Sequence, residues 1–298
     1  MSIAGNVGLG DLPRICPLIS RRVQASSDST ETRVVQAGPV RFGGARPVVI
    51  AGPCTVESRE QTLAVARAVK AAGAEMLRGG AFKPRTSPHD FQGLGIEGLH
   101  ILSEARRETG LPIVTEVMDP RLVETVAEYA DMLQIGSRNM QNYPLLVEAG
   151  KSGKPILLKR GMAASLCEWL GAAEYIAKEG NLEIVLCERG IKAFSAGEYS
   201  RNLLDLSVIP AVMEETFLPV IVDPSHSTGV SNMVERASCA AIAFGSHGLL
   251  IEVACDHDGA QRPICDAAQA IGPATLCNIL RFIDSRMESR ILRKAHAV

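Results

Sequence analysis

The chain has 298 residues, of which 46% are hydrophobic and 21% charged, a composition typical of a globular protein with one large core. Its net charge of −2 argues against a nucleic-acid-binding protein, in which basic residues usually dominate. No apolar run approaches the ~18 to 20 residues of a membrane-spanning helix, and the N-terminal residues lack the pattern of a secretory signal. These features predict a cytoplasmic protein without nucleic-acid or membrane partners, and its eight scattered cysteines fit reduced thiols.

The N-terminal segment differs in character from the rest of the chain. Residues 1–35 include the polar run ASSDSTET and show no clear hydrophobic period, so we expect a flexible tail there. Residues 36–298 are expected to form a single catalytic domain. At its beginning, VVQAGPVRFGG has two extended segments around Gly38 and Pro39, which favours a β-hairpin.

A regular alternation of strands and helices begins at residue 47. Eight short apolar runs are typical of buried parallel strands: PVVIAG, AEMLRG, LPIVTEV, MLQIGS, KPILLKR, LEIVLCE, LPVIVDP and GLLIEVA. Helical segments such as ESREQTLAVARAVKAAG and RLVETVAEYA lie between most of them, and Gly73 and Gly110 are expected helix ends. Eight such units predict a (β/α)₈ TIM barrel. An open doubly wound sheet is the alternative, but no GxGxxG motif opens the first helix.

Polar residues follow every predicted strand, where a barrel of this kind carries its active site. Among them are six cations from different strand ends: Arg78, Lys83, Arg85, Arg138, Lys159 and Arg189. Their convergence would create a strong site for more than one anionic group in a chain of slightly negative charge. The segment GGAFKPRTSP contains two prolines, which would hold its cations in place before a ligand arrives.

Four further residues form a candidate metal site: Cys54, His226, Glu252 and Asp266. A thiolate, an imidazole and carboxylates suit a divalent transition ion such as Mn²⁺, Fe²⁺, Co²⁺ or Zn²⁺. Glu252 is the strongest signal, because a carboxylate in a buried strand is costly unless it is paired or metal-bound. Asp258 is the alternative to Asp266 as the fourth ligand.

Several motifs together resemble the type I 3-deoxy-D-arabino-heptulosonate 7-phosphate (DAHP) synthases: AGPCTVES, RGGAFKPRTSP, GLG, TEVMD, QIGSRNMQN, LLKRG, CERG and VDPSH. The resemblance is to their β subgroup, which is related to the 3-deoxy-octulosonate 8-phosphate synthases, and it extends over residues 36–285. It implies a (β/α)₈ barrel that assembles as a homodimer or homotetramer. It also implies the first step of the shikimate pathway of aromatic amino-acid biosynthesis, in which phosphoenolpyruvate condenses with the aldose phosphate erythrose 4-phosphate.

The resemblance also implies roles for individual residues. The metal ligands of the family fall on Cys54, His226, Glu252 and Asp266. Its phosphoenolpyruvate contacts fall on Arg78, Lys83, Glu116, Ser137, Arg138, Lys159 and Arg189. The aldose phosphate would contact Lys83, Pro84, Arg85 and Thr86. The implied catalytic residues are Lys83, Cys54 and His226. Lys83 could protonate the forming alkoxide or hold the carboxylate, and Cys54 and His226 would act at the metal.

The chain departs from the family pattern near the expected aldose site. AFSAGEYSRNLLDL and VACDHDGAQRP are longer than the corresponding family segments, and PHD replaces a run that contains an aromatic residue. Arg201 is expected to fill an arginine position of the family. These changes keep several alternatives open: a paralogue with a modified aldose acceptor, an octulosonate synthase, a catalytically silent regulatory barrel, and an aldolase that forms a Schiff base on Lys159.

Overall fold

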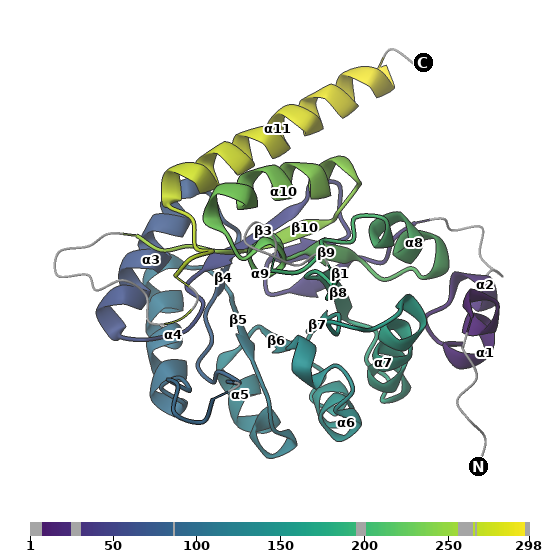
Figure 1. Cartoon of the computed structure of the whole chain (residues 1–298), viewed down its shortest axis with the longest axis horizontal. Coiled ribbons are helices and arrows are strands. Elements are labelled where there is room, and N and C mark those ends of the chain that lie inside the picture. Colours follow the sequence, from purple (N-terminus) through teal and green to yellow (C-terminus); the bar gives the residue numbers. More distant parts are fainter. Residues whose placement is uncertain are drawn as a thin grey trace.

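The computed structural model describes residues 8–24, 31–85, 87–194, 201–255, 265 and 267–295. Its centre is a closed barrel of eight parallel strands, in which β10 pairs with both β9 and β3 (Figure 1). The strands are β3 (Val48–Gly52), β4 (Met76–Arg78), β5 (Ile113–Glu116), β6 (Met132–Ile135), β7 (Ile156–Lys159), β8 (Ile184–Glu188), β9 (Val220–Val222) and β10 (Gly248–Glu252). Every residue of these strands is buried, which explains their unbroken apolar runs. The predicted TIM barrel and its eight strands are confirmed.

Helices surround the barrel and connect its strands (Figure 1). They are α3 (Arg59–Ala72), α4 (Ile96–Thr109), α5 (Val123–Tyr129), α6 (Tyr143–Lys151), α7 (Leu166–Lys178), α8 (Val208–Glu215), α9 (Pro224–Thr228), α10 (Ser231–Ala243) and α11 (Pro273–Ala295). Gly73 and Gly110 end α3 and α4 with φ of +104° and +72°, a left-handed conformation that glycine adopts without steric cost. Among the described helices, none is long and apolar enough to cross a membrane.

The predicted hairpin is present as β1 (Val35–Ala37) and β2 (Val40–Phe42). Its side chains alternate between buried and exposed, and Phe42 is completely buried. The buried ones form one apolar cluster with barrel residues such as Ile50, Met76 and Leu250. These residues lie at the beginning or the centre of their strands. The hairpin therefore packs at the amino-terminal end of the barrel and leaves the carboxyl end open for a site.

Part of the expected N-terminal tail is folded. It contains η1 (Leu9–Asp11), α1 (Leu12–Ile15) and α2 (Arg21–Gln24), and Leu12, Cys16 and Ile19 are buried in the main core. These three residues have the spacing of one helical face, a short signal that the polar run after residue 24 obscures. The expectation of a flexible tail is therefore wrong for residues 8–24, whereas residues 1–7 and 25–30 lie outside the described part.

A cationic cavity beside a candidate metal centre

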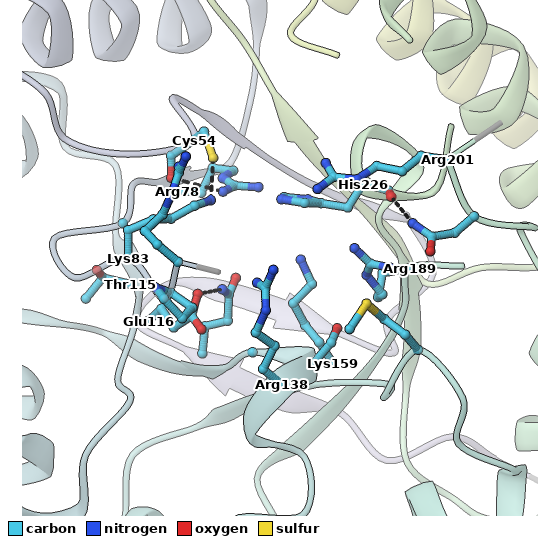
Figure 2. Close-up of a pocket in the computed structure, with 18 of the residues that line it drawn as sticks. Cys54, Arg78, Lys83, Thr115, Glu116, Arg138, Lys159, Arg189, Arg201 and His226 are labelled. Carbon is cyan, nitrogen blue, oxygen red and sulfur yellow. Dashed lines mark hydrogen bonds between the residues drawn. The ribbon is translucent and has the colours of Figure 1, made fainter. Parts of the chain in front are cut away.

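A cavity of about 640 Å³ opens at the carboxyl ends of the barrel strands. Figure 2 shows cationic side chains from several strand ends and loops pointing into it from opposite sides. The residues expected from the sequence that line it are Cys54, Arg78, Lys83, Pro84, Arg85, Glu116, Ser137, Arg138, Lys159, Arg189 and His226. Thr86, Asp266 and Asp258 lie outside the described residues. Barrel closure thus brings together side chains that are far apart in the chain.

Cys54, His226 and Glu252 meet on one wall of the barrel mouth. One ligand atom from each of the three lies within 4.8 Å of the others, and Nε2 of His226 is 3.2 Å from Oε1 of Glu252. Cys54 follows β3, His226 lies in α9 after β9, and Glu252 ends β10. These three strands are neighbours in the barrel, so their carboxyl ends place the three side chains next to one another.

The imidazole of His226 is oriented by Asp223, the N-cap residue of α9. Nδ1 of His226 lies 2.7 Å from Oδ2 of Asp223, and the backbone N–H of His226 donates to Oδ1 at 2.9 Å. A hydrogen bond on Nδ1 leaves Nε2 directed towards Glu252, which is the usual arrangement for a metal-binding histidine. Burial lowers the pKa of His226 despite the opposing charge of Asp223, which favours the neutral, metal-binding form.

The thiol of Cys54 also has an environment suited to a metal ligand. Nζ of Lys83 lies 2.6 Å from Sγ of Cys54, and an ammonium group at this distance stabilises a thiolate. Glu252 is completely buried, and its backbone and side chain are held by Ser225 and Gln269. A thiolate, an oriented imidazole and a fixed carboxylate fit a divalent transition ion.

Buried cations lie on both sides of the cavity, with Arg78 beside Cys54 and Lys159 across from it (Figure 2). Arg78 is 3.2 Å from Oε1 of Glu252, and Lys159 forms a buried ion pair with Asp223. Within the described part of the chain, Nε of Arg189 and both Nε and Nη1 of Arg78 are buried without a hydrogen-bond acceptor. Buried donors of this kind need a partner, and guanidinium groups match carboxylate or phosphate. The cavity is therefore built for an anionic ligand.

Glu116 provides an acidic group within this cationic surface. Burial raises the pKa of its carboxyl, and the charges of Lys83 and Lys159 offset part of that effect. Gln134 donates to Oε2 at 3.1 Å. Gly136 leaves room for the carboxylate, since a Cβ atom on this residue would lie 2.0 Å from Oε1 of Glu116.

Arg85 lies at the outer edge of the cavity, on the loop after β4. Its guanidinium contacts Asp90 at 3.1 Å and the Sγ of Cys265 at 3.0 Å. Cys265 is itself buried, and its backbone N–H donates to Glu57 at 2.9 Å. The cation of this loop is thus positioned by a residue 180 positions away in the sequence.

The comparison with known proteins defines the family. The model of the DAHP synthetase I family matches residues 25–289. The chain belongs to this family. A phospho-2-dehydro-3-deoxyheptonate aldolase of Thermotoga maritima is 46% identical over 81% of this chain and 70% of the relative. A 2-dehydro-3-deoxyphosphooctonate aldolase of Syntrophotalea carbinolica is 36% identical over 80% of this chain and 90% of the relative.

Solved structures agree with this membership. The crystal structure of the Thermotoga maritima DAHP synthase has a TM-score of 0.83 and 41% identity, and the match covers 91% of this chain and 76% of that chain. A truncated form of the synthase from the same organism has a TM-score of 0.81 and 38% identity over 92% of this chain and 97% of that chain. The fold and family expected from the motifs are confirmed.

The sequence did not single out some of the residues that form the site. Asp223 lies within the motif VDPSH and Gln134 within MLQIGS, but only barrel closure shows that they contact His226 and Glu116. The cavity is also lined by Met162, Lys192 and Asn202. Arg201, the expected family arginine, lines the cavity and donates to Gln269 at 3.3 Å. For Asn202, the available sequence signal was its position among polar residues of the same loop, next to Arg201.

Proposed function

We propose that the chain is a DAHP synthase, which condenses phosphoenolpyruvate with erythrose 4-phosphate and water to give DAHP and inorganic phosphate. The seven carbons of the product correspond to three from phosphoenolpyruvate and four from the aldose. The Thermotoga relative that carries this name is 46% identical, compared with 36% for the octulosonate relative. We further propose that it acts in the cytoplasm as a homodimer or homotetramer, at the first step of the shikimate pathway.

The observation that carries the proposal is the set of buried guanidinium donors without acceptors in the described residues of a largely cationic cavity. Phosphoenolpyruvate has a phosphate and a carboxylate, which are two anionic groups at a short, fixed separation. We assign the phosphate to Lys159, Arg189 and Arg138, and the carboxylate to Arg78 and Lys83. Ser137 lines the same cavity and supplies a hydroxyl donor.

We assign Cys54, His226, Glu252 and Asp266 as ligands of a divalent ion, with Mn²⁺, Fe²⁺, Co²⁺ and Zn²⁺ as the candidates. When bound, such an ion would supply a Lewis acid for the aldehyde oxygen. The burial of Glu252 and the orientation of His226 by Asp223 support this assignment. We also assign Lys83, Pro84, Arg85 and Thr86 to the aldose phosphate.

The chain's own residues account for the remaining chemistry. C3 of phosphoenolpyruvate forms a bond with the aldehyde carbon, water adds at C2, and the bond between C2 and the phosphate oxygen then breaks. Lys83 lies beside Cys54 and would deliver a proton to the forming alkoxide. Glu116 has one carboxylate oxygen on Gln134 and would accept a hydrogen bond from the incoming water with the other. Lys159 and Arg189 would stabilise the charge of the departing phosphate.

The main alternative is an octulosonate synthase or a paralogue with another acceptor. An eight-carbon product requires a five-carbon aldose phosphate, and the contact between Arg85 and Cys265 lies at the end of the cavity where such an acceptor would differ. One of the chain's departures from the family pattern, PHD at residues 88–90, lies beside this contact, since Asp90 pairs with Arg85 at 3.1 Å. The reaction with phosphoenolpyruvate would be the same in both cases, so only the acceptor distinguishes them.

The test is a panel of acceptors with the purified, metal-loaded protein. Phosphoenolpyruvate is supplied with erythrose 4-phosphate, arabinose 5-phosphate or ribose 5-phosphate, and its loss is followed by ultraviolet absorbance together with phosphate release. We expect the highest kcat/KM with erythrose 4-phosphate. A higher value with a five-carbon acceptor would reject DAHP synthesis, and no phosphate release with any acceptor would favour a silent barrel. Borohydride inactivation in the presence of substrate would instead indicate a Schiff base on Lys159.

A further inference from the structure

One carboxylate connects the two parts of the site. The side chain of Asp223 is completely buried, and its Oδ2 contacts both Nζ of Lys159 and Nδ1 of His226. Its Oδ1 accepts the backbone N–H of His226 at 2.9 Å. Lys159 ends β7 and His226 lies after β9, so Asp223 directly links a cation of the cavity to a candidate metal ligand from another part of the barrel.

We propose that Asp223 couples metal binding at His226 to phosphoenolpyruvate binding at Lys159, so that each ligand strengthens the binding of the other. This inference rests on the proposed function, since it takes phosphoenolpyruvate as the ligand of Lys159. Asp223 is a positioning residue in this scheme, because it touches neither ligand itself. It acts by dividing one negative charge between two cationic or hydrogen-bonding partners.

The sign of the coupling follows from the shared oxygen. A phosphate that binds Lys159 competes with Asp223 for the ammonium group, which leaves more negative charge on Oδ2 for the imidazole of His226. A stronger hydrogen bond at Nδ1 makes Nε2 a better metal ligand. Conversely, a metal on Nε2 makes Nδ1–H a stronger donor, which draws Oδ2 away from Lys159 and leaves the ammonium group for the phosphate. The coupling is positive and must be equal in both directions.

A direct attraction between the metal and the anionic substrate would also give positive coupling. The two effects are separable because the direct attraction does not pass through Asp223. An Asp223→Asn variant keeps the shape of the side chain but removes the charge that is divided. The metal should then bind more weakly, because Nδ1 of His226 loses a charged acceptor, whereas the phosphate no longer competes with a carboxylate for Lys159. The informative quantity is the ratio of metal affinities with and without phosphoenolpyruvate.

The experiment is isothermal titration of metal-free protein with Mn²⁺, with and without saturating phosphoenolpyruvate. Affinities are corrected for the weak complex that Mn²⁺ forms with phosphoenolpyruvate in solution. We expect the wild-type ratio to be at least about fivefold, which is the lower range of coupling between two sites. The Asp223→Asn ratio should be clearly smaller, and what remains of it measures the direct attraction. An unchanged ratio in this variant, with both ligands bound, overturns the coupling through Asp223. Wild-type protein that binds Mn²⁺ but no phosphoenolpyruvate contradicts the proposed function itself, and the coupling with it.

The matched control is Glu188→Gln. Glu188 is another completely buried carboxylate at a neighbouring strand end, but it pairs with Arg160 and not with a candidate metal ligand. Its coupling ratio should equal that of the wild type, and a ratio as low as that of Asp223→Asn would show a general effect of buried charge and reject the proposal.

A second measurement covers the case in which Asp223→Asn does not fold. In metal-free wild-type protein with ¹⁵N-labelled histidine, phosphoenolpyruvate should shift the Nδ1 resonance of His226, assigned with His226→Gln. Binding of phosphoenolpyruvate without such a shift also overturns the proposal.

Discussion

Nζ of Lys83 lies 2.6 Å from the Sγ of Cys54, so the cation of a proline-stiffened loop contacts the thiol that follows the first barrel strand. This relationship places a proton donor at the edge of the candidate metal site. Replacement of Lys83 by Met should lower kcat by about a hundredfold or more, which is the usual contribution of a general acid. The loss should persist when the variant is saturated with metal, and the metal content should be measured by mass spectrometry under the same conditions.

The matched control is Lys70→Met, an exposed lysine in the last turn of α3. Its kcat should not change. Lys83→Met could instead lose its metal and regain wild-type turnover when metal is added. This outcome would show that Lys83 supports the thiolate and is not the proton donor.

Removal of the metal should abolish the condensation without unfolding the barrel. The apolar core and the hairpin cluster do not include His226 or Glu252, so circular dichroism should be unchanged after treatment with a chelator. Added Mn²⁺, Fe²⁺, Co²⁺ or Zn²⁺ should restore turnover to different extents, and their order identifies the preferred ion. Full turnover with far less than one metal per chain would contradict a metal requirement.

Gly136→Ala should damage the site through Glu116. The new Cβ atom would lie 2.0 Å from Oε1 of Glu116, so the buried carboxylate must move away from Gln134 and the cavity. We expect a loss of about 1 to 3 kcal/mol in the free energy of unfolding, measured with urea, together with a lower kcat. In Gly171→Ala, the Cβ atom would meet only Ile15, at 4.0 Å, so this helical control should be neutral or stabilising. Equal stability of both variants would show that Glu116 moves at no cost.

Arg85→Ala should separate the two substrates. A charged hydrogen bond contributes about 1.5 to 3 kcal/mol, so the KM for the aldose phosphate should rise roughly ten- to a hundredfold while the KM for phosphoenolpyruvate stays constant. Steady-state kinetics with each substrate varied in turn would measure this. Arg121→Ala removes an exposed arginine that pairs locally with Asp119, and both KM values should be retained. A rise in the KM for phosphoenolpyruvate alone would reassign Arg85 to the other substrate.

The sequence predicted the elements and the cations because both are local signals. Eight apolar runs mark buried strands, and the polar residue after each run marks the active end of the barrel. The same reasoning does not find partners across the barrel. Asp223 and Gln134 are ordinary polar residues in their motifs, and their importance depends on contacts with Lys159, His226 and Glu116 that only closure creates. The buried residues from Leu12 to Ile19 were missed because the segment is short and its helix ends at Ile15.

The ion pair between Arg160 and Glu188 should control stability in a pH-dependent way. Arg160 is 2.9 Å from both Glu188 and Asp205, and its neighbours in the chain are Lys159 and the loop after β7. Arg160→Met leaves Glu188 buried without its cation, which costs about 3 to 5 kcal/mol in comparable buried pairs. Thermal and urea unfolding would measure the loss.

The pH dependence has a definite sign. Burial already raises the pKa of Glu188 in the wild type despite the opposing charge of Arg160, and loss of that charge should raise it further. A carboxyl with a raised pKa in the folded state binds a proton on folding, so the folded variant becomes less stable as the pH rises from the unfolded pKa through the folded one. The deficit of Arg160→Met relative to the wild type should therefore be larger at pH 8 than at pH 5. The double variant with Glu188→Gln should recover stability at pH 8, and a deficit independent of pH would show that lost packing against Trp169, and not the unpaired carboxylate, causes the effect.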